Sequence, residues 1–406
     1  MTLGTRFGVL LLTATLVACA ARPEPDTAPE PAAPPLPPQP DTPAIPAPAH
    51  PAPARFERLP VQLALVGDIN LGTSTLPDGI PPDSGRGLLD AARPFLTGDL
   101  VIGNLEGVLA DTGTSEKCLE ETSPPPRPHR PSRSRPRASA PARAGCYAFL
   151  TPTHLAPRLR DAGFTHLGLA NNHAHDYGLP GRGSTERTLD TLGIRWYGPL
   201  GHVALDTLQR GDSMTVVGLI GFATYPHSYD LLDIPRSVAV VDSVQRLADV
   251  VVVTFHGGSE GTEATRVGPG PEFLGREPRG DLRTWAHAVV DAGADLVVGH
   301  GPHVLRGMEW YRGRIIAYSL GNFATYRGFS LAGPLGVTGV LQVQLGPDGR
   351  WTGARLVPMQ QAPRRGPAPD ASALAVTMIN ELSVQDFGAD AVRLAPDGRL
   401  LPPADR

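Results

Sequence analysis

Short hydrophobic runs alternate with amphipathic segments from about residue 59 onward in this 406-residue chain. The runs expected to form strands are 61–66, 99–103, 165–170, 214–223, 250–255, 295–299, 314–319 and 337–345. The segments expected to form helices are 88–96, 153–162, 184–192 and 281–292. Alternation of strands and helices favours a mostly parallel sheet with helices packed outside it. The sequence therefore predicts an α/β fold.

Polar residues that can bind metal ions stand directly after several of these runs. Asp68, Asn104, His256 and His300 each follow a predicted strand, and so does the segment 171–173. The carboxyl ends of strands in an α/β sheet converge on one crevice, where ligands bind. A single strand-end aspartate is more often a turn residue than a ligand. Five such strand ends in succession predict one shared site.

Composition limits the classes of partner and the number of domains. The 406 residues are enough for one large α/β domain or two small ones. Apolar residues make up 41% of the chain, so a substantial core is possible. The formal net charge is −4, and this argues against a nucleic-acid partner because such binding needs a basic face. Lys117 is the only lysine, so arginine carries almost all the positive charge.

The first 19 residues have the features of an export signal. Arg6 supplies a positive charge, residues 7–17 form an apolar run too short to span a bilayer comfortably, and this run leads into Cys19. Small residues before a cysteine resemble the bacterial lipobox, in which the cysteine is acylated. We therefore expect a lipoprotein signal peptide over 1–19, lipidation at Cys19, and an exported cell-envelope protein anchored to a membrane. The alternatives are a plain secretory peptide and an uncleaved anchor.

Two proline-rich segments interrupt the hydrophobic pattern. Residues 20–57 are rich in Pro and Ala, which favours an extended, disordered linker. Residues 119–145 form an Arg- and Pro-rich insertion within a folded domain expected over 58–402. The arginines of this insertion either contact a polyanion or are simply solvated. Cys118 and Cys146 bracket the insertion, and their even number in an exported domain predicts a disulfide between them.

Six short motifs contain the strand-end residues. They are GDIN (67–70), GNLE (103–106), NNHAHDYG (171–178), FHGGSE (255–260), GHGPHV (299–304) and YSLGNF (318–323). In this order they resemble the CapA family, which is linked to poly-gamma-glutamate and capsule biosynthesis and whose domain is similar to the calcineurin-like metallophosphoesterases. The resemblance runs from about residue 59 into the C-terminal region. It implies a four-layer α/β/β/α sandwich of the metallophosphoesterase type.

The resemblance also implies a site for one or two divalent metal ions. Two ions about 3.5–4 Å apart can polarise a phosphoryl oxygen, and carboxylate, amide and imidazole ligands suit Mn, Fe, Zn or Mg. The implied metal ligands are Asp68, Glu106, Asn172, His256, His300 and His303. His173 is implied as a catalytic general acid that faces the leaving group. Asp176 is expected either to orient a histidine of its own loop or to cap the helix that follows.

Other motif residues are expected to support the ligands or to contact a substrate. These are Asn70, Asn104, His175, Glu260 and Asn322. Five further histidines are expected to be surface or satisfied core residues, namely His154, His166, His202, His227 and His287. Asn70 departs from the phosphoesterase pattern, which has a histidine there. A site with fewer strong ligands would hold one metal, bind metal weakly, or have lost turnover.

Three functions agree with this pattern. The first is a metal-dependent hydrolase that acts on an envelope phosphoester or polymer linkage. The second is a non-catalytic, membrane-tethered accessory that binds an anionic polymer and works with a membrane polymer synthase. The third is a binding module for a small ligand. The metal-type residues favour the first function over the third. The asparagine at position 70 makes the second function nearly as well supported as the first.

Overall fold

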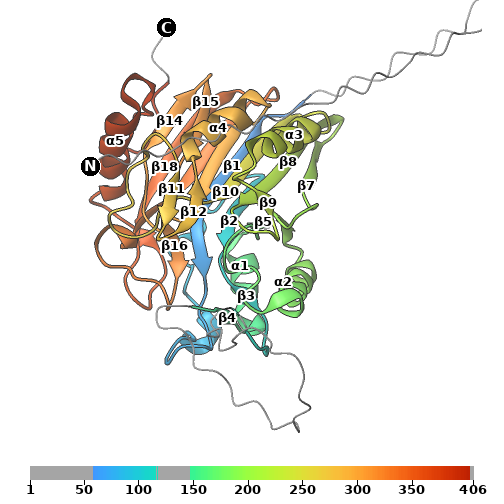
Figure 1. The fold of residues 1–406 in the computed structure, drawn as a ribbon, viewed down its shortest axis with the longest axis vertical. Helices are drawn as coiled ribbons and strands as arrows, with labels where there is room; N and C mark the ends of the chain where they lie inside the picture. Colours follow the sequence, from blue (N-terminus) through green and yellow to red (C-terminus); the bar gives the residue numbers. More distant parts are fainter. Residues whose placement is uncertain (1–57, 116, 118–146, 403–406) are drawn as a thin grey trace, which may run out of the picture. The chain divides into compact units, whose positions relative to one another are not determined.

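Two large β-sheets, with helices on their outer faces, form the folded part of the protein (Figure 1). This computed structural model describes residues 58–115, 117 and 147–402. The predicted signal peptide, linker and insertion lie outside the described residues. Among the helices of the described part, none has both the length and the apolar character needed to cross a bilayer.

The first sheet has eight strands, and β1 lies in its middle. Its order is β19 (Ala368–Pro369), β18 (Trp351–Gln360), β17 (Val337–Leu345), β1 (Val61–Asn70), β2 (Leu100–Leu105), β5 (His166–Gly168) and β6 (Arg195–Tyr197), with β16 (Asn322–Thr325) also pairing with β1. The pairs from β1 to β6 are parallel, and β16 is parallel to β1. The pairs from β1 to β19 are antiparallel. The expected parallel arrangement therefore holds where helices connect the strands, and the C-terminal hairpins add antiparallel strands.

The second sheet has seven strands. Its order is β14 (Met308–Tyr311), β15 (Arg314–Ala317), β13 (Leu296–His300), β10 (Val250–His256), β8 (Ser213–Ala223) and β7 (Ala204–Arg210), with β9 (Tyr229–Asp230) pairing with β8. Two small ribbons complete the described strands: β3 (Val108–Leu109) with β4 (Leu150–Thr151), and β11 (Glu272–Leu274) with β12 (Glu277–Gly280). The central strands β8, β10, β13 and β15 are parallel, so their carboxyl ends lie at one edge of the sheet.

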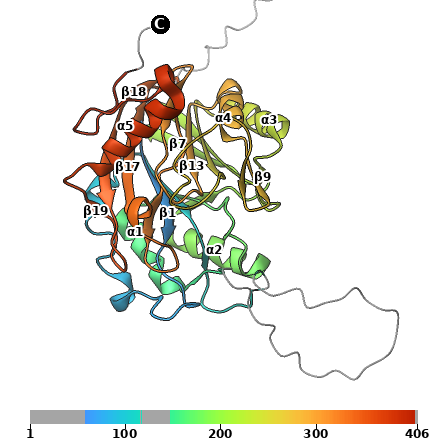
Figure 2. The ribbon, with the colours of Figure 1, turned by 60° about the vertical axis from the view of Figure 1, so that its left-hand side comes forward.

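The two sheets face each other across an aliphatic core. Leu65 and Leu341 from the first sheet belong to the same buried cluster as Leu219 and Val252 from the second. Each such side chain contributes roughly 1.5–3 kcal/mol when it is fully buried. Helix α5 (Leu374–Phe387) contacts β14, β17 and β18, and so covers one open side of this core (Figure 2).

Helices cover the outer face of each sheet. α1 (Pro157–Ala162) and α2 (Gly178–Leu192) pack on the first sheet, and α3 (Ile234–Gln245) and α4 (Leu282–Asp291) pack on the second (Figure 1). Asp233 and Asp281 begin α3 and α4 by accepting hydrogen bonds from backbone N–H groups of their first turns. The predicted four-layer α/β/β/α sandwich is confirmed.

Two of the expected helices differ from those in the structure. The segment 88–96 forms turns and the short 3₁₀ helix Arg93–Phe95, because Pro94 cannot occupy the interior of an α-helix. The helix expected over 184–192 begins earlier, at Gly178, directly after the motif that contains His173. Its start therefore lies closer to the candidate site than the hydrophobic pattern indicated.

Candidate metal centre

The carboxyl ends of strands from both sheets bring the predicted ligands together. In the first sheet Asp68 pairs with Asn104 across β1 and β2, and in the second His256 pairs with His300 across β10 and β13. His303 joins the two sheets, because its Nδ1 lies 3.0 Å from Asp68 Oδ2. The expected convergence of strand ends is therefore present in the fold.

The centre of the site is a cluster of Asp68, Glu106 and His303. One potential ligand atom of each lies within 4.8 Å of the other two. Two more histidines adjoin the cluster: His300 Nδ1 is 3.5 Å from Asp68 Oδ1, and His256 Nε2 is 3.9 Å from Glu106 Oε1. His303 is held in the left-handed backbone region, with φ of 61°, which is uncommon for a residue other than glycine and is found most often at functional sites.

Several buried polar atoms of the site have no hydrogen-bond partner among the described residues. They are both carboxylate oxygens of Glu106, both ring nitrogens of His256, Nδ1 of His300 and the side-chain oxygen of Asn172. Buried polar groups in folded proteins are nearly always hydrogen-bonded, so a group of unpaired polar atoms indicates that a ligand binds among them. Carboxylate, imidazole and amide groups are the donors that a divalent cation requires. The residues present therefore fit a metal ion.

The two carboxylates of the cluster differ in their electrostatic state. Burial alone would raise the pKa of Asp68, but the neighbouring imidazoles of His300 and His303 outweigh burial and hold that pKa well below its usual range. Burial raises the pKa of Glu106 well above its usual range, and the nearby charge of Asp68 raises it further. Asp68 is therefore ionised at neutral pH. Glu106 ionises readily only when a cation lies beside it.

The two histidines nearest to these carboxylates also differ. Burial lowers the pKa of His256 well below its ordinary value, and the charge of Arg279 adds to this effect. Burial would lower the pKa of His303 as well, but the carboxylates of Glu106 and Asp68 outweigh burial and raise it to about 10. His256 is therefore neutral and ready to bind a metal ion, whereas His303 carries a proton that a bound cation would have to displace.

A chain of asparagine side chains connects the cluster to the loop after β5. Asn104 Nδ2 donates to Asp68 Oδ1 at 2.8 Å, and Asn171 Nδ2 donates to Asn104 Oδ1 at 2.9 Å. The Asn171 side-chain oxygen then accepts from the backbone N–H of His173 at 3.0 Å. Asn104 therefore orients Asp68, as expected of a supporting residue. Asn171 holds the backbone of the loop that contains His173. Sequence reasoning assigned Asn171 no role of its own.

Asn70 supports the backbone of the site. Its Nδ2 donates to the backbone oxygen of Glu106 at 2.8 Å, and its Oδ1 accepts from the backbone N–H of Gly72 at 3.1 Å. Both ends of this amide are therefore occupied by the protein itself. Asn70 therefore holds the loop that presents Glu106.

His173 and Asp176 form a hydrogen-bonded pair. His173 Nδ1 lies 2.6 Å from Asp176 Oδ2. Helix α2 begins without a side-chain cap, so Asp176 orients a histidine of its own loop, the first of its two predicted roles. Burial lowers the pKa of His173 to about 4, although Asp176 opposes the shift. At neutral pH His173 is therefore an uncharged imidazole whose Nε2 accepts a proton, and its role as a general acid stays a prediction.

His175 and Asn322 contact parts of the site other than the carboxylate cluster. The ring of His175 stacks on His227 at 4.1 Å, and His227 Nε2 lies 3.0 Å from the backbone oxygen of Asn171. His227, expected to be an ordinary core or surface histidine, therefore supports the loop after β5. Asn322 Nδ2 donates to the backbone oxygen of Leu335 at 3.1 Å. It therefore anchors a neighbouring loop.

The motif YSLGNF packs against β1 directly beside Asp68. The backbone N–H of Asp68 donates to the oxygen of Gly321 at 2.9 Å. A Cβ atom placed on Gly67 would lie only 1.8 Å from that same oxygen, so no residue other than glycine fits at position 67. This close approach explains why glycine precedes the aspartate of the first motif.

Glu260 connects the cluster to a buried cation. Its Oε2 lies 3.9 Å from His303 Nε2, and its Oε1 lies 2.8 Å from Arg279 Nη2. Arg279 lies on β12 and has no exposed surface. Nothing in its local sequence distinguishes it, because no motif contains it.

Two phenylalanines form an apolar wall beside the histidines. The ring centroids of Phe149 and Phe329 are 4.9 Å apart. Phe149 lies 4.3 Å from His173, and Phe329 lies 5.2 Å from His303. Sequence reasoning missed both residues, because they lie on separate loops without periodic patterning. Cys19, Cys118 and Cys146 lie outside the described residues, so lipidation and the disulfide stay predictions.

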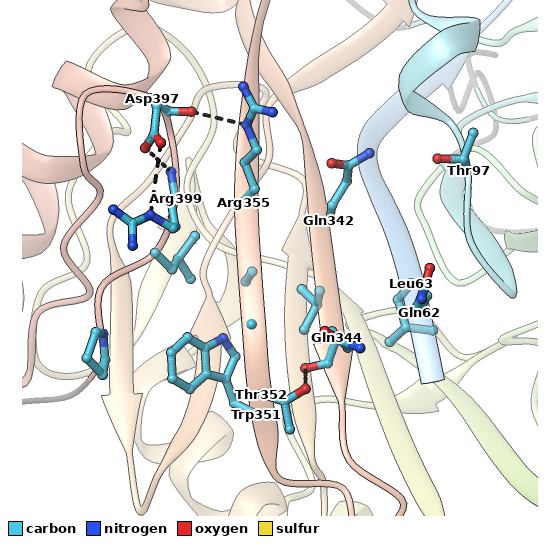
Figure 3. Close-up of a pocket in the computed structure, with 15 residues that line it drawn as sticks. Gln62, Leu63, Thr97, Gln342, Gln344, Trp351, Thr352, Arg355, Asp397 and Arg399 are labelled. Atoms are coloured by element: carbon cyan, nitrogen blue, oxygen red, sulfur yellow. Dashed lines mark hydrogen bonds and ion pairs between the residues drawn. The ribbon is translucent and has the colours of Figure 1, made fainter. Parts of the chain in front are cut away.

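A groove of about 740 Å³ lies at the other end of β1, away from the cluster (Figure 3). It is lined by uncharged polar side chains such as Gln62, Gln342 and Gln344, together with Trp351 and Arg355. Gln62 pairs with Gln344 near the amino end of β1, whereas Asp68 lies near its carboxyl end. None of the candidate ligands lines this groove, so it is separate from the metal centre.

Comparison with known proteins gives matches to capsule synthesis proteins. Residues 136–327 match the family described as "Bacterial capsule synthesis protein PGA_cap", a span that includes His173, His256, His300 and His303. The chain is 34% identical over 189 residues to the PGA biosynthesis protein CapA of Bacillus subtilis, covering 42% of this chain and 45% of that protein. The capsule biosynthesis protein CapA of Bacillus anthracis is also 34% identical, with coverage of 42% and 43%. The chain thus spans less than half the length of these relatives.

A solved structure of a 5'-nucleotidase precursor from Thermus thermophilus is similar over 55% of this chain and 43% of that one. The sequence identity is 15% and the TM-score is 0.30.

Proposed function

We propose that this chain, whose residues 136–327 match the PGA_cap family of bacterial capsule synthesis proteins, is a divalent-metal-dependent hydrolase. Its substrate is a phosphoester or polymer linkage in the biosynthesis or processing of a capsule or envelope polymer of the poly-gamma-glutamate type. The names of the two Bacillus relatives support the polymer class. The proposed hydrolase activity is supported by the geometry of the candidate metal centre.

The observation that carries the proposal is the group of unpaired buried ligand atoms around Asp68, Glu106 and His303. The residues that would hold one or two cations are Asp68, Glu106, Asn172, His256, His300 and His303. A bound divalent ion would act as a Lewis acid that polarises the scissile group. A fold has little reason to bury unpaired carboxylate and imidazole groups unless a ligand compensates their loss of hydration.

Three other features would prepare this site for a substrate. Asp176 fixes the tautomer of His173 by accepting from Nδ1, so Nε2 is the nitrogen free to exchange a proton with a bound substrate. The wall of Phe149 and Phe329 limits water around His173 and His303. Arg279 pairs with Glu260 and so fixes that carboxylate beside His303, where it can contact a bound substrate.

We further propose that the protein works at the cell envelope, held by acylation of Cys19. This proposal rests on the sequence of the N-terminal segment. Cys19→Ser should release the full-length protein from the membrane fraction or leave it unprocessed, and metabolic labelling with a palmitate analogue should disappear. Unchanged labelling of Cys19→Ser would contradict lipidation at this residue.

A non-catalytic accessory that binds an anionic polymer is the second candidate function. Two neighbouring grooves of about 320 and 380 Å³ share Tyr326 and Arg364, and both are lined by arginines. These arginines are Arg86, Arg327, Arg364 and Arg365. Exposed arginines along a groove suit a chain of carboxylates or phosphates. The alternative gains further support because the Asn70 amide is bonded to backbone groups of Glu106 and Gly72 and so adds no ligand to the candidate centre.

Metal content and hydrolysis together test the proposal. The full-length protein, purified without chelator and reloaded with Mn²⁺, Fe²⁺ or Zn²⁺, should hold stoichiometric metal by mass spectrometry of the bound element. His303→Ala and Glu106→Gln should lose metal, whereas His154→Ala, at an exposed position outside the site, should not. His173→Ala should keep its metal and lose hydrolysis of an aryl phosphodiester. Metal binding without hydrolysis in the wild type would favour the accessory, and a wild type without metal would refute the site.

A further inference from the structure

Lys117, the only lysine of the chain, lies against the loop that carries Asn172, His173 and Asp176. Its Nζ is 2.6 Å from Asp176 Oδ1, 2.8 Å from the backbone oxygen of Asn172 and 3.2 Å from His173 Nδ1. These contacts join residues at least 55 positions apart in the sequence. One ammonium group therefore contacts three functional residues of the loop.

The carboxylate of Asp176 depends on this ammonium group. Its side chain has no exposed surface, and it is bonded to Lys117 Nζ, to His173 Nδ1 and to the backbone N–H of Phe149, at 2.6, 2.6 and 2.7 Å. Burial of a carboxylate is costly unless a charge compensates it. Short charge-assisted hydrogen bonds are the strong kind. Lys117 therefore places a positive charge against the buried carboxylate of Asp176, behind His173.

Lys117 also holds the peptide that carries Asn172. The backbone oxygen of Asn172 accepts from Lys117, while its side-chain oxygen is buried without a hydrogen-bond partner among the described residues. Backbone and side chain branch from the same Cα atom, so a fixed carbonyl restricts where the amide oxygen points. Groups that hold a metal ligand from behind commonly change metal affinity about 10–100-fold.

We propose that Lys117 is a positioning residue of the candidate metal centre. It holds the loop 171–176 in the conformation that points the Asn172 side chain toward the metal and keeps His173 against Asp176. The part of this proposal that concerns metal rests on the proposed function. The part that concerns the loop rests only on the contacts of Lys117.

The chemistry of lysine suits this position better than that of arginine. An ammonium group is a compact charge with three rotatable donors, whereas a guanidinium group is a planar fork suited to one bidentate partner. The acceptors of Lys117 belong to two different residues, Asn172 and Asp176, and lie in different directions around the His173 ring. Every other basic residue among the 36 Lys and Arg of the chain is an arginine, so this position is chemically distinct within the protein.

Hydrogen exchange of the full-length, metal-free protein tests the positioning of the loop. In Lys117→Met the backbone amides of 171–178 should exchange roughly tenfold faster than in the wild type, as loss of a charged hydrogen bond predicts. Lys117→Arg should lie between the two, because it restores the charge with a different shape. Arg246→Met is the matched control, since it removes an exposed cation that pairs with Asp242 on α3.

Calorimetric titration with Mn²⁺ or Zn²⁺ tests the consequence for metal. Lys117→Met should raise the dissociation constant for the metal about tenfold or more. The visible spectrum of the Co²⁺-loaded protein should also change. Lys117→Arg should recover part of both, and Arg246→Met should match the wild type. These readouts separate a positioning role from a merely structural one, because a loss of overall stability leaves the Co²⁺ spectrum of the folded protein unchanged.

The outcomes distinguish this proposal from the proposed function. Unchanged exchange of 171–178 in Lys117→Met overturns the positioning role, whatever the metal result. Faster exchange with an unchanged metal affinity and Co²⁺ spectrum also overturns it, because the ligand is then set by other groups. If the wild type binds no metal, the proposed function fails, and the exchange result alone decides whether Lys117 holds the loop.

Discussion

Glu106 and Glu309 are both buried glutamates, yet their surroundings are opposite. Glu309, on β14, accepts from Arg283 Nη2 at 3.1 Å and Tyr318 Oη at 2.8 Å, and lies 3.0 Å from His287 Nε2. Neither oxygen of Glu106 has a hydrogen-bond partner among the described residues, and its nearest histidine nitrogens are 3.8 and 3.9 Å away. The protein itself supplies the hydrogen-bond partners of Glu309, whereas the carboxylate oxygens of Glu106 can accept a ligand.

The pKa shifts of the two residues follow from this difference. Burial would raise the pKa of Glu309, but hydrogen bonds from His287 and Tyr318 outweigh burial and lower it. Burial raises the pKa of Glu106, and the charge of Asp68 adds to the rise. Burial has the same sign in both places, so the partners decide whether a buried carboxylate stabilises the fold.

Glu309→Ala should lower the free energy of unfolding by about 3 kcal/mol, because removal of one member of a buried ion pair leaves the others uncompensated. Arg283 and His287 are partly exposed and can regain water, which places the loss at the lower end of the usual range. Urea denaturation of the purified protein measures it, with Glu309→Gln expected to recover part of the loss. A loss below about 1 kcal/mol would show that Glu309 is not a stabilising centre.

Addition of Mn²⁺ or Zn²⁺ at about 100 times its dissociation constant should stabilise the wild type by roughly 2.7 kcal/mol. The gain should largely disappear in Glu106→Gln and remain in Glu309→Ala, because only the first carboxylate faces the candidate ligands. Denaturation curves with and without metal measure both effects. An equal gain in Glu106→Gln would remove Glu106 from the proposed ligand set.

Asp295 is an intermediate case, and its effect should depend on pH. It accepts from the backbone N–H of Val251 at 2.8 Å and pairs with Arg314 at 3.1 Å, yet burial still raises its pKa to about 6. A raised carboxyl pKa favours the protonated folded state, so its stabilising effect is complete below about pH 4 and is lost as pH rises through about 6.

Relative to Asp295→Asn, the wild type should therefore lose roughly 2 kcal/mol of stability between pH 4 and pH 7. Denaturation of both proteins across this range gives the difference directly, so that the titration of other groups cancels. A constant difference between the two proteins from pH 4 to pH 7 would show that Asp295 titrates normally.

Glu106→Gln in the metal-free protein should change stability by no more than about 1 kcal/mol, and toward greater stability. The substitution removes a buried carboxylate that lacks partners and replaces it with a neutral group of the same shape. The measurement is denaturation in the presence of a chelator. A loss above about 2 kcal/mol would mean that the fold itself depends on Glu106, and the contrast with Glu309 would then fail.

Much of the candidate site could be predicted from the chain, because its residues follow a local rule. Asp68, His256 and His300 each lie at the carboxyl end of a hydrophobic strand, and such ends meet at one edge of a sheet. The segment 88–96 shows the limit of the same reasoning. Its apolar spacing indicates a helix, but Pro94 and the glycines before it favour turns.

Residues that act through distant contacts could not be predicted in this way. Lys117 borders the Arg- and Pro-rich insertion, and Arg279 lies in a short ribbon, so neither has a periodic pattern around it. The contacts of a residue whose importance was predicted could not be predicted either. Asn70 was expected near the ligands, but whether its amide faced a metal or the backbone of Glu106 depended on the loop after β2.

The alternation of strands and helices, the order of the six motifs and the chemical types of the candidate ligands follow from the chain alone, because they depend on side-chain identity and local period. Which of these groups touch depends on how the sheets and loops pack. Asp68 lies on β1 of the first sheet, and His303 lies 235 positions away in the loop after β13 of the second; their 3.0 Å contact exists because the inner faces of those sheets pack together. The same packing satisfied Glu309 and left Glu106 without a partner, since hydrogen bonding depends on distances that no local pattern specifies.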